Sequence, residues 1–250
     1  MTTCDTQSAK QFDSHHVQAV KLSSVPGLRT AISGGGMKSQ DVLLLIKLIC
    51  LEQREREQKR RHSETAELIK LGDINPSSQW QGWDDPPLQE PPVHKDSYSV
   101  RALQASLGIS KTEIASALKR SQQIGLLRTD PDTQLPRVNS KALLGFIEHG
   151  LRYVFPVKPA EIVRGIPTSF SAPVLQEKLM SGGDLIYVWP DAFGNRKGQS
   201  ITPLFRTVPG AVKKDSRLYE YLALIDAIRL GNARESNLAN EILRGKVLQA

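Results

Sequence analysis

Polar and basic side chains recur at helical spacing between residues 111 and 123, and these residue types suit contact with nucleic acid. The face consists of Thr112, Ser116, Lys119 and Gln123, flanked by Lys111 and Arg120. Short hydroxyl, amide and cationic groups hydrogen-bond to base edges and phosphate oxygens in the major groove of DNA. After Glu113 the segment carries no acidic residue. The pattern therefore predicts a surface that binds DNA.

Catalytic and metal-binding patterns are missing from the sequence. The five histidines are scattered, and neither H-E-x-x-H nor C-x-x-C occurs. Cys4 and Cys50 cannot build a disulfide framework or a four-cysteine metal site. The run Gly34-Gly35-Gly36-Met37-Lys38-Ser39 lacks the spacing of a phosphate-binding loop, and we interpret it as a hinge. We expect no enzymatic activity, no metal and no cofactor.

Two short helices around Gly108 are predicted to position the polar face. Ser99 can cap the first helix, and Gly108 can end it in the left-handed conformation. Ile109 fills the turn, and Ser110 and Glu113 have the spacing of a capping box for the second helix. The apolar faces consist of Val100, Leu103 and Leu107 in the first helix and of Ile114, Ala117, Leu118 and Ser121 in the second. This arrangement is typical of a helix-turn-helix.

A hairpin and a further helix are predicted after Gly125. Leu126–Thr129 and Pro136–Asn139 have strand character, and residues 130–132 form the turn between them. Arg128 and Arg137 could reach backbone phosphates beside the second helix. Ser140 can then cap a helix over residues 141–148. Its apolar face consists of Leu143, Leu144, Phe146 and Ile147.

The segment Leu103–Leu127, L-Q-A-S-L-G-I-S-K-T-E-I-A-S-A-L-K-R-S-Q-Q-I-G-L-L, resembles the winged helix-turn-helix of bacterial transcription regulators of the multiple-antibiotic-resistance repressor (MarR-like) family. With the preceding helix, the resemblance covers residues 38–150. It implies a dimeric repressor or activator that inserts its second helix into the major groove and lays its wing on the flanking backbone. The groove positions implied are Lys111, Thr112, Ala115, Ser116, Lys119 and Arg120. The long insertion Leu51–Asp96 departs from the family pattern.

The segment before the motif divides into an apolar helix, a charged continuation and a proline-rich loop. A helix from Lys38 has a buried stripe of Val42, Leu45, Ile46, Ile49 and Cys50. Residues 52–62 are either a solvated extension of this helix, which we favour, or a phosphate-contacting patch of Arg54, Arg56, Lys59, Arg60 and Arg61. Trp80 and Trp83 lie in the acidic loop 72–96, and we expect them to pin it to the body of the protein.

The C-terminal part is predicted to contain three extended segments and two helices. The extended segments are Leu151–Val157, Leu185–Trp189 and Ile201–Phe205. Asp215 or Ser216 can cap a helix that Gly231 ends, and a second helix follows. Their apolar faces are Leu218, Tyr221, Leu222, Ile225 and Ile228 in the first and Leu238, Ala239, Ile242 and Leu243 in the second. We expect these faces to make a symmetric dimer contact.

Length and composition complete the prediction. The chain has 250 residues, 39% of them hydrophobic and 24% charged, with a formal net charge of +7. We expect an α+β, mainly α protein without a secretory signal or membrane span, located in the cytoplasm. The predicted parts are a flexible arm (1–36), a winged helix-turn-helix domain (37–150, insertion 52–96) and a smaller α/β dimerisation or partner-binding region (151–250).

Two functions remain open on the sequence. The favoured function is a homodimeric regulator of transcription, with repression the favoured direction, that reads double-stranded DNA with the helix 111–124. The alternative is a helix-turn-helix-like adaptor that binds a protein partner without reading DNA. No residue pattern identifies a small-molecule effector.

Overall fold

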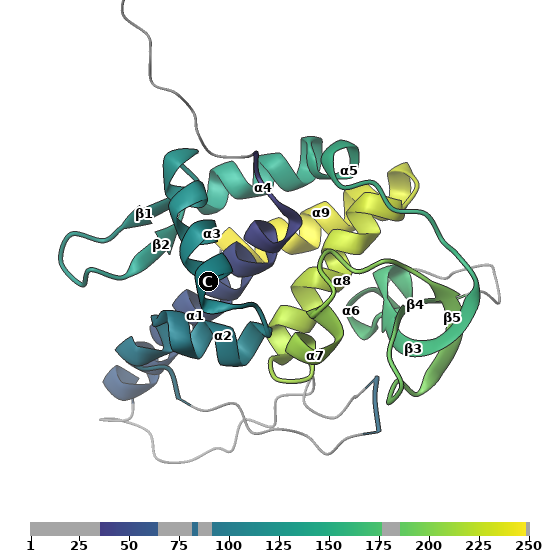
Figure 1. The fold of residues 1–250 in the computed structure, drawn as a ribbon, viewed down its shortest axis with the longest axis horizontal. Coiled ribbons are helices and arrows are strands. Elements are labelled where there is room, and N and C mark those ends of the chain that lie inside the picture. The colour runs from purple at the N-terminus through teal and green to yellow at the C-terminus, as the bar shows by residue number, and fades with distance from the viewer. Residues whose placement is uncertain (1–35, 65–81, 85–91, 177–185, 249–250) are drawn as a thin grey trace, which may run out of the picture. The chain divides into compact units, whose positions relative to one another are not determined.

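The structure, a computed structural model, describes residues 36–64, 82–84, 92–176 and 186–248. These residues form an α+β, mainly helical arrangement (Figure 1), which confirms the coarse fold class predicted from the sequence. The elements in chain order are α1 (Ser39–Glu64), η2 (Lys95–Tyr98), α2 (Val100–Leu107), α3 (Lys111–Gln123), β1 (Leu127–Thr129), β2 (Pro136–Val138), α4 (Ser140–His149), α5 (Leu151–Val154), β3 (Ile162–Thr168), η3 (Ser169–Ser171), α6 (Pro173–Gln176), β4 (Tyr187–Pro190), β5 (Arg196–Ser200), α7 (Val208–Val212), α8 (Ser216–Leu230) and α9 (Ala233–Leu248). Apart from Gly36, the predicted arm lies outside the described residues.

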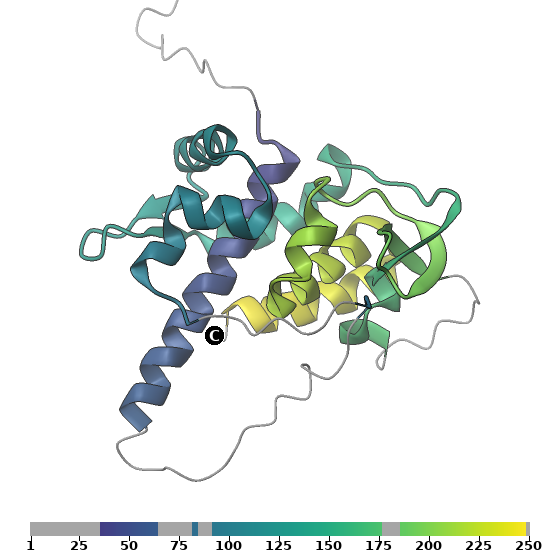
Figure 2. The same cartoon turned by 60° about the horizontal axis from the view of Figure 1, so that its bottom comes forward.

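Helix α1 runs through the core rather than along its surface. Every side chain from residue 41 to residue 53 is buried, including Cys50 as predicted. The predicted stripe explains only part of this burial, because α3, β2 and α8 all pack against the helix. Residues 52–64, predicted as the start of an insertion, continue α1 as helix, and its last turns extend away from the neighbouring elements (Figure 2).

Local sequence signals place α2 and α3 correctly. Ser99 and Ser110 cap the two helices and accept hydrogen bonds from backbone N–H groups three residues further on, at 3.2 and 3.3 Å. Gly108 adopts the predicted left-handed conformation with φ of 67°. The other half of the predicted capping box is not formed, because the Glu113 carboxylate ion-pairs with Arg120 at 2.6 Å instead.

Strands β1 and β2 form an antiparallel hairpin directly after α3, as predicted. Leu127 lies opposite Val138 in the hairpin. Strand β1 contacts α3 and strand β2 contacts α1, so the hairpin is attached to both helices (Figure 1). The cap of α4 is Asn139 rather than the predicted Ser140, because the Asn139 side chain accepts the backbone N–H three residues further on at 3.2 Å. The helix therefore begins one residue earlier than predicted.

The C-terminal region confirms one of the three predicted extended segments, because Tyr187–Pro190 form strand β4, and departs from the other two. Residues 151–154 form α5, and residues 201–205 are irregular. Strand β5 occupies part of the predicted connection between residues 191 and 200, and the sequence pattern does not indicate β3. Short apolar runs fit a buried helix or loop as well as a strand, and their periodicity cannot distinguish these structures.

Strands β3, β4 and β5 close on one another, and glycine allows their backbones to come together. Strand β3 pairs antiparallel with both other strands, which pair parallel with each other. A Cβ atom at Gly165 would collide with the backbone of Trp189, and one at Gly194 would collide with the backbone of Gly165. Both positions therefore require glycine.

Residues before and after residue 150 contribute to the same hydrophobic core. The described residues belong to one compact unit that begins at Gly36, and α8 packs against both α1 and α9. The apolar faces predicted at residues 218–228 and 238–243 are packed into this core. The buried residues of these faces are not available for the predicted symmetric dimer contact, and the core continues across the predicted boundary near residue 150.

Trp83 pins part of the proline-rich loop to the body, as predicted. Its ring is buried and meets Tyr219 edge-on, with 5.9 Å between ring centroids. Trp80 lies outside the described residues. None of the helices in the described part of the chain is long and apolar enough to cross a bilayer.

Candidate nucleic-acid interface

The predicted polar and basic face lies on the surface of α3. Ile114, Ala117 and Ser121 are buried on the inner side of the helix, which turns the opposite side outward. The outward positions are Lys111, Thr112, Ala115, Lys119 and Gln123, which are exposed, and Ser116, which is half-buried. Since Glu113 is the only acidic residue of α3 and is ion-paired, this face carries a net positive charge.

Arg120, predicted beside this face, points inward. Its Nε and Nη2 atoms donate to the two carboxylate oxygens of Asp41 at 2.9 and 2.7 Å, and only 13% of its side chain is exposed. Bidentate pairing of this kind fixes both distance and orientation. Arg120 therefore acts as a positioning residue that holds α3 against the start of α1.

Four charged groups form the junction between α1 and α3. Arg120 also donates to Glu113 at 2.6 Å, and Lys38 Nζ donates to the same carboxylate oxygen at 3.3 Å. The hydrogen bond from Arg120 lowers the pKa of Glu113. Asp41 is fully buried and also accepts the Lys38 backbone N–H at 2.9 Å. The junction therefore satisfies charges that would otherwise be costly to bury.

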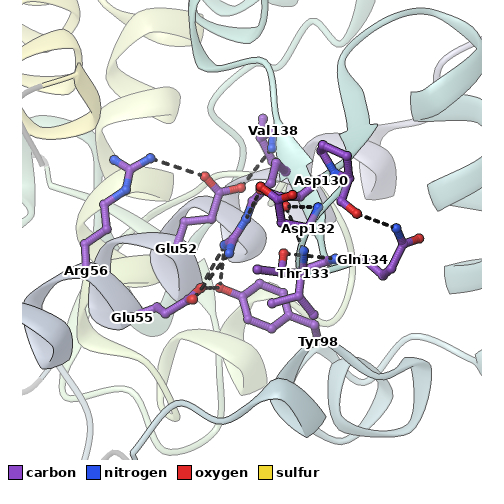
Figure 3. A network of polar contacts seen from close by, with 12 residues as sticks. Glu52, Glu55, Arg56, Tyr98, Asp130, Asp132, Thr133, Gln134 and Val138 are labelled. Carbon is purple, nitrogen blue, oxygen red and sulfur yellow. Dashed lines mark hydrogen bonds and ion pairs between the residues drawn. The ribbon is translucent and has the colours of Figure 1, made fainter.

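The two predicted hairpin arginines lie in different environments. Arg128 is exposed on β1. Arg137 on β2 donates through Nη1 to Glu55 at 2.8 Å, and its guanidinium lies over the Tyr98 ring at 5.5 Å from the centroid. The Tyr98 hydroxyl donates to the same Glu55 oxygen at 2.8 Å (Figure 3). Arg137 therefore fastens the hairpin to α1, whereas Arg128 remains accessible from outside.

The Glu55 carboxylate is held ionised by its neighbours. Burial raises its pKa, but hydrogen bonds from Arg137, Lys59 and Tyr98 outweigh burial and lower the pKa to about 2. A carboxyl group with a depressed pKa stabilises the fold above its unfolded pKa, and this stabilisation is lost as the pH falls through the folded value. The hairpin attachment is therefore sensitive to acid.

We expect Glu55→Gln to lower the free energy of unfolding by about 2 kcal/mol at pH 7, because it removes the charge that pairs with Arg137. The difference from wild type should shrink between about pH 5 and about pH 2, where the wild-type carboxylate itself becomes protonated. Urea unfolding at a series of pH values measures this. Glu148→Gln, which alters an ion pair with the half-exposed Arg244, is the control and should change stability by less than about 1 kcal/mol. A pH-independent difference would contradict the assignment.

The tip of the hairpin is acidic. Asp130 Oδ1 accepts the backbone N–H groups of Asp132 and Thr133 at 3.0 and 2.9 Å, which shapes the turn. The hydrogen bond from Thr133 lowers the pKa of Asp130. Asp132 is exposed at the tip. A phosphate backbone would therefore be repelled at the tip of the hairpin.

The charged continuation of α1 is helical, as the favoured alternative predicts, but only part of it is exposed to solvent. Arg54 is mostly buried and donates to Asp215 at 2.9 Å. Arg56 and Lys59 have exposed side chains, and Lys59 forms an ion pair with Glu55 at 2.8 Å. The continuation is thus part interior and part surface.

Sequence reasoning missed the acidic residues that position the interface. Asp41 precedes the apolar run of α1, and Glu55 follows it. Asp41 is a single carboxylate beside an apolar run, whereas Glu55 lies among several charged residues, and neither pattern reveals the partner. The partners Arg120 and Arg137 lie 79 and 82 residues away along the chain.

Within the described ranges, no group of three or more histidine, cysteine, aspartate or glutamate side chains could hold a metal ion. No model of a known protein family, no curated protein and no solved structure matches the chain. The case for a nucleic-acid interface therefore depends on the residues and geometry of α3 and the hairpin.

Proposed function

We propose that this protein is a regulator of transcription that binds double-stranded DNA through a winged helix-turn-helix formed by α2, α3 and the β1–β2 hairpin. The observation that carries the proposal is the outward face of α3, which combines Lys111 and Lys119 with short polar side chains and has no unpaired carboxylate. A helix with such a face fits a major groove about 12 Å wide.

The exposed residues divide by the contacts they offer. Thr112, Ser116 and Gln123 offer hydrogen bonds to base edges, and Ala115 offers a small apolar contact for a thymine methyl group. Lys111, Lys119 and Arg128 offer cationic groups, of which the first two can reach bases or phosphates. Arg120 and Arg137 support the interface from inside and are not assigned to DNA.

A homodimer remains part of the proposal, because one groove helix gives few base contacts and paired half-sites are the usual remedy. The dimer has to use a surface other than the buried faces of α8 and α9.

The decisive experiment compares two triple variants in salt-dependent binding to duplex DNA. Changing Lys111, Lys119 and Arg128 together to glutamine should reduce the slope of log K against log salt by about 2 to 3, because each lost phosphate contact contributes about 0.9. The matched control changes the exposed Lys158, Arg196 and Lys197 to glutamine and should leave the slope unchanged.

Selection of binding sites from random-sequence duplexes then tests base reading. Gln123→Ala should relax preference at one base position, at a cost of about 1–3 kcal/mol for the favoured site. Equal slopes for the two triple variants, or no selected sequence, would overturn the proposal.

A further inference from the structure

A hollow lined by basic residues lies at the base of the hairpin, next to the end of α3. Its volume is about 350 Å³. Cationic residues line it from three separate elements: Arg56 from α1, Arg128 from β1 and Lys141 from α4. Ser140 contributes a hydroxyl group, and Val247 near the end of α9 contributes an apolar wall. The hollow therefore combines cationic, hydrogen-bonding and apolar groups.

The charge balance of the hollow favours an anion. Glu52 does not line the hollow, but it is buried next to Arg56, which does (Figure 3). One Glu52 oxygen accepts the backbone N–H of Val138 at 2.8 Å, and the other lies 3.8 Å from Arg56. Among the residues that line the hollow, three are cationic and none is acidic, so the lining carries a net positive charge.

The start of α4 adds to this positive field. The hollow is lined by residues 139–141, which form the cap and first turn of α4. The first turn of a helix carries backbone N–H groups without partners inside the helix and the positive end of the helix dipole. The Asn139 side chain accepts one of them, from Ala142 at 3.2 Å. Cationic groups and a helix start together fit the oxygens of a phosphate.

We propose that this hollow binds a phosphate group, held by Arg56, Arg128 and Lys141, with the remainder of the ligand against Val247. The volume falls in the range of small-molecule sites and exceeds what a bare phosphate needs. Two sources share this chemistry: a small phosphate ester, and the backbone of bound DNA. The proposal goes beyond the reading of bases by α3 and does not depend on it.

Calorimetric titration without DNA tests the site directly. Inorganic phosphate, pyrophosphate and adenosine 5′-monophosphate are the probes, in a chloride buffer. We expect saturable binding to the wild type. Binding to Lys141→Gln and to Arg128→Gln should be about tenfold weaker, because each variant loses a charge-assisted contact. Lys158→Gln is the control, because Lys158 is exposed and does not line the hollow, and it should bind as the wild type does. Circular dichroism verifies that each variant is folded.

Two results would overturn the proposal: no saturable binding of any probe up to about 10 mM, or equal weakening in the Lys158→Gln control. Duplex DNA added to the pyrophosphate complex then identifies the source of the phosphate. Displacement of pyrophosphate would support the site with the DNA backbone as its ligand. Simultaneous binding of DNA and pyrophosphate would support the site with a small phosphate ester as its ligand. Because the titration uses no DNA, its failure is distinct from a failure of the proposed DNA binding.

Discussion

Replacing Asp215 by alanine is expected to lower the free energy of unfolding by about 3–5 kcal/mol. Asp215 is 1% exposed and accepts hydrogen bonds from Lys47 at 2.6 Å and Arg54 at 2.9 Å, so its loss leaves two mostly buried cations without their carboxylate. It also caps α8 by accepting the backbone N–H of Leu218 at 3.0 Å. Removing a helix cap adds about 1 kcal/mol.

Acidification is expected to reduce the difference in stability between the wild type and Asp215→Ala. Burial raises the pKa of Asp215, but Lys47 and Arg54 outweigh burial and leave the pKa below its ordinary value. The stabilisation by Asp215 is therefore present above the unfolded pKa and lost as the pH falls through the folded value. We expect the wild type and the variant to converge in stability on acidification.

Urea unfolding at pH 7 measures the loss, and two further variants assign its cause. Glu57→Gln alters the more exposed pair with Arg217 on the same helices and should cost less than about 1 kcal/mol. Lys47→Met in the Asp215→Ala background should restore part of the stability, because it removes one uncompensated charge. A loss below about 1 kcal/mol for Asp215→Ala would contradict the assignment.

The second large effect is expected at Asp226, which joins α8 to the three-stranded sheet. Its carboxylate accepts hydrogen bonds from Trp189 Nε1 at 2.6 Å, Thr168 Oγ1 at 3.1 Å and Arg229 Nη1 at 2.7 Å. Asp226→Ala should lower the free energy of unfolding by about 3–5 kcal/mol, because Arg229 would be left buried and unpaired. Burial raises the pKa of Asp226, so desolvation reduces the net benefit of its charge.

Tryptophan fluorescence combined with urea unfolding measures this effect. The Trp189 ring is buried and meets Tyr219 at 5.9 Å between centroids, so loosening of the sheet should shift its emission towards longer wavelength. Glu220→Gln is the control on the same helix, because its pair with Lys246 is partly exposed, and less than about 1 kcal/mol should be lost. An unchanged emission together with an unchanged unfolding midpoint would argue against a structural role for Asp226.

Local structure between residues 99 and 140 could be predicted from the sequence because its causes are local. Ser99 and Ser110 accept hydrogen bonds from backbone N–H groups three residues away. Gly108 adopts the left-handed backbone conformation that ends α2. Helical spacing of apolar residues likewise predicted the buried and exposed sides of α3. Such signals act within one or two helical turns, so they could be read without knowledge of the fold.

The C-terminal strands and the burial of α8 could not be predicted in the same way. Strand β3 pairs with two strands at once, which brings Gly165 of β3 against the backbone of β4 and against Gly194 in the connection between β4 and β5. Helix α8 has the apolar pattern of an interface helix, but α1 and α9 of the same chain cover it. The spacing of apolar residues along a helix indicates that one face of the helix is buried, but it does not indicate which element buries that face.

The sequence by itself determined helices α2 and α3, the hairpin and the polar, basic face of α3, because caps, turns and periodicity are short-range properties. Only the tertiary structure decided which cations belong to the surface. Arg128 and Lys119 are exposed, whereas Arg120, Arg137 and Arg54 bind carboxylates 79, 82 and 161 residues away along the chain. An arginine has the same side chain in both settings, and its role follows from the charge that the folded chain places beside it.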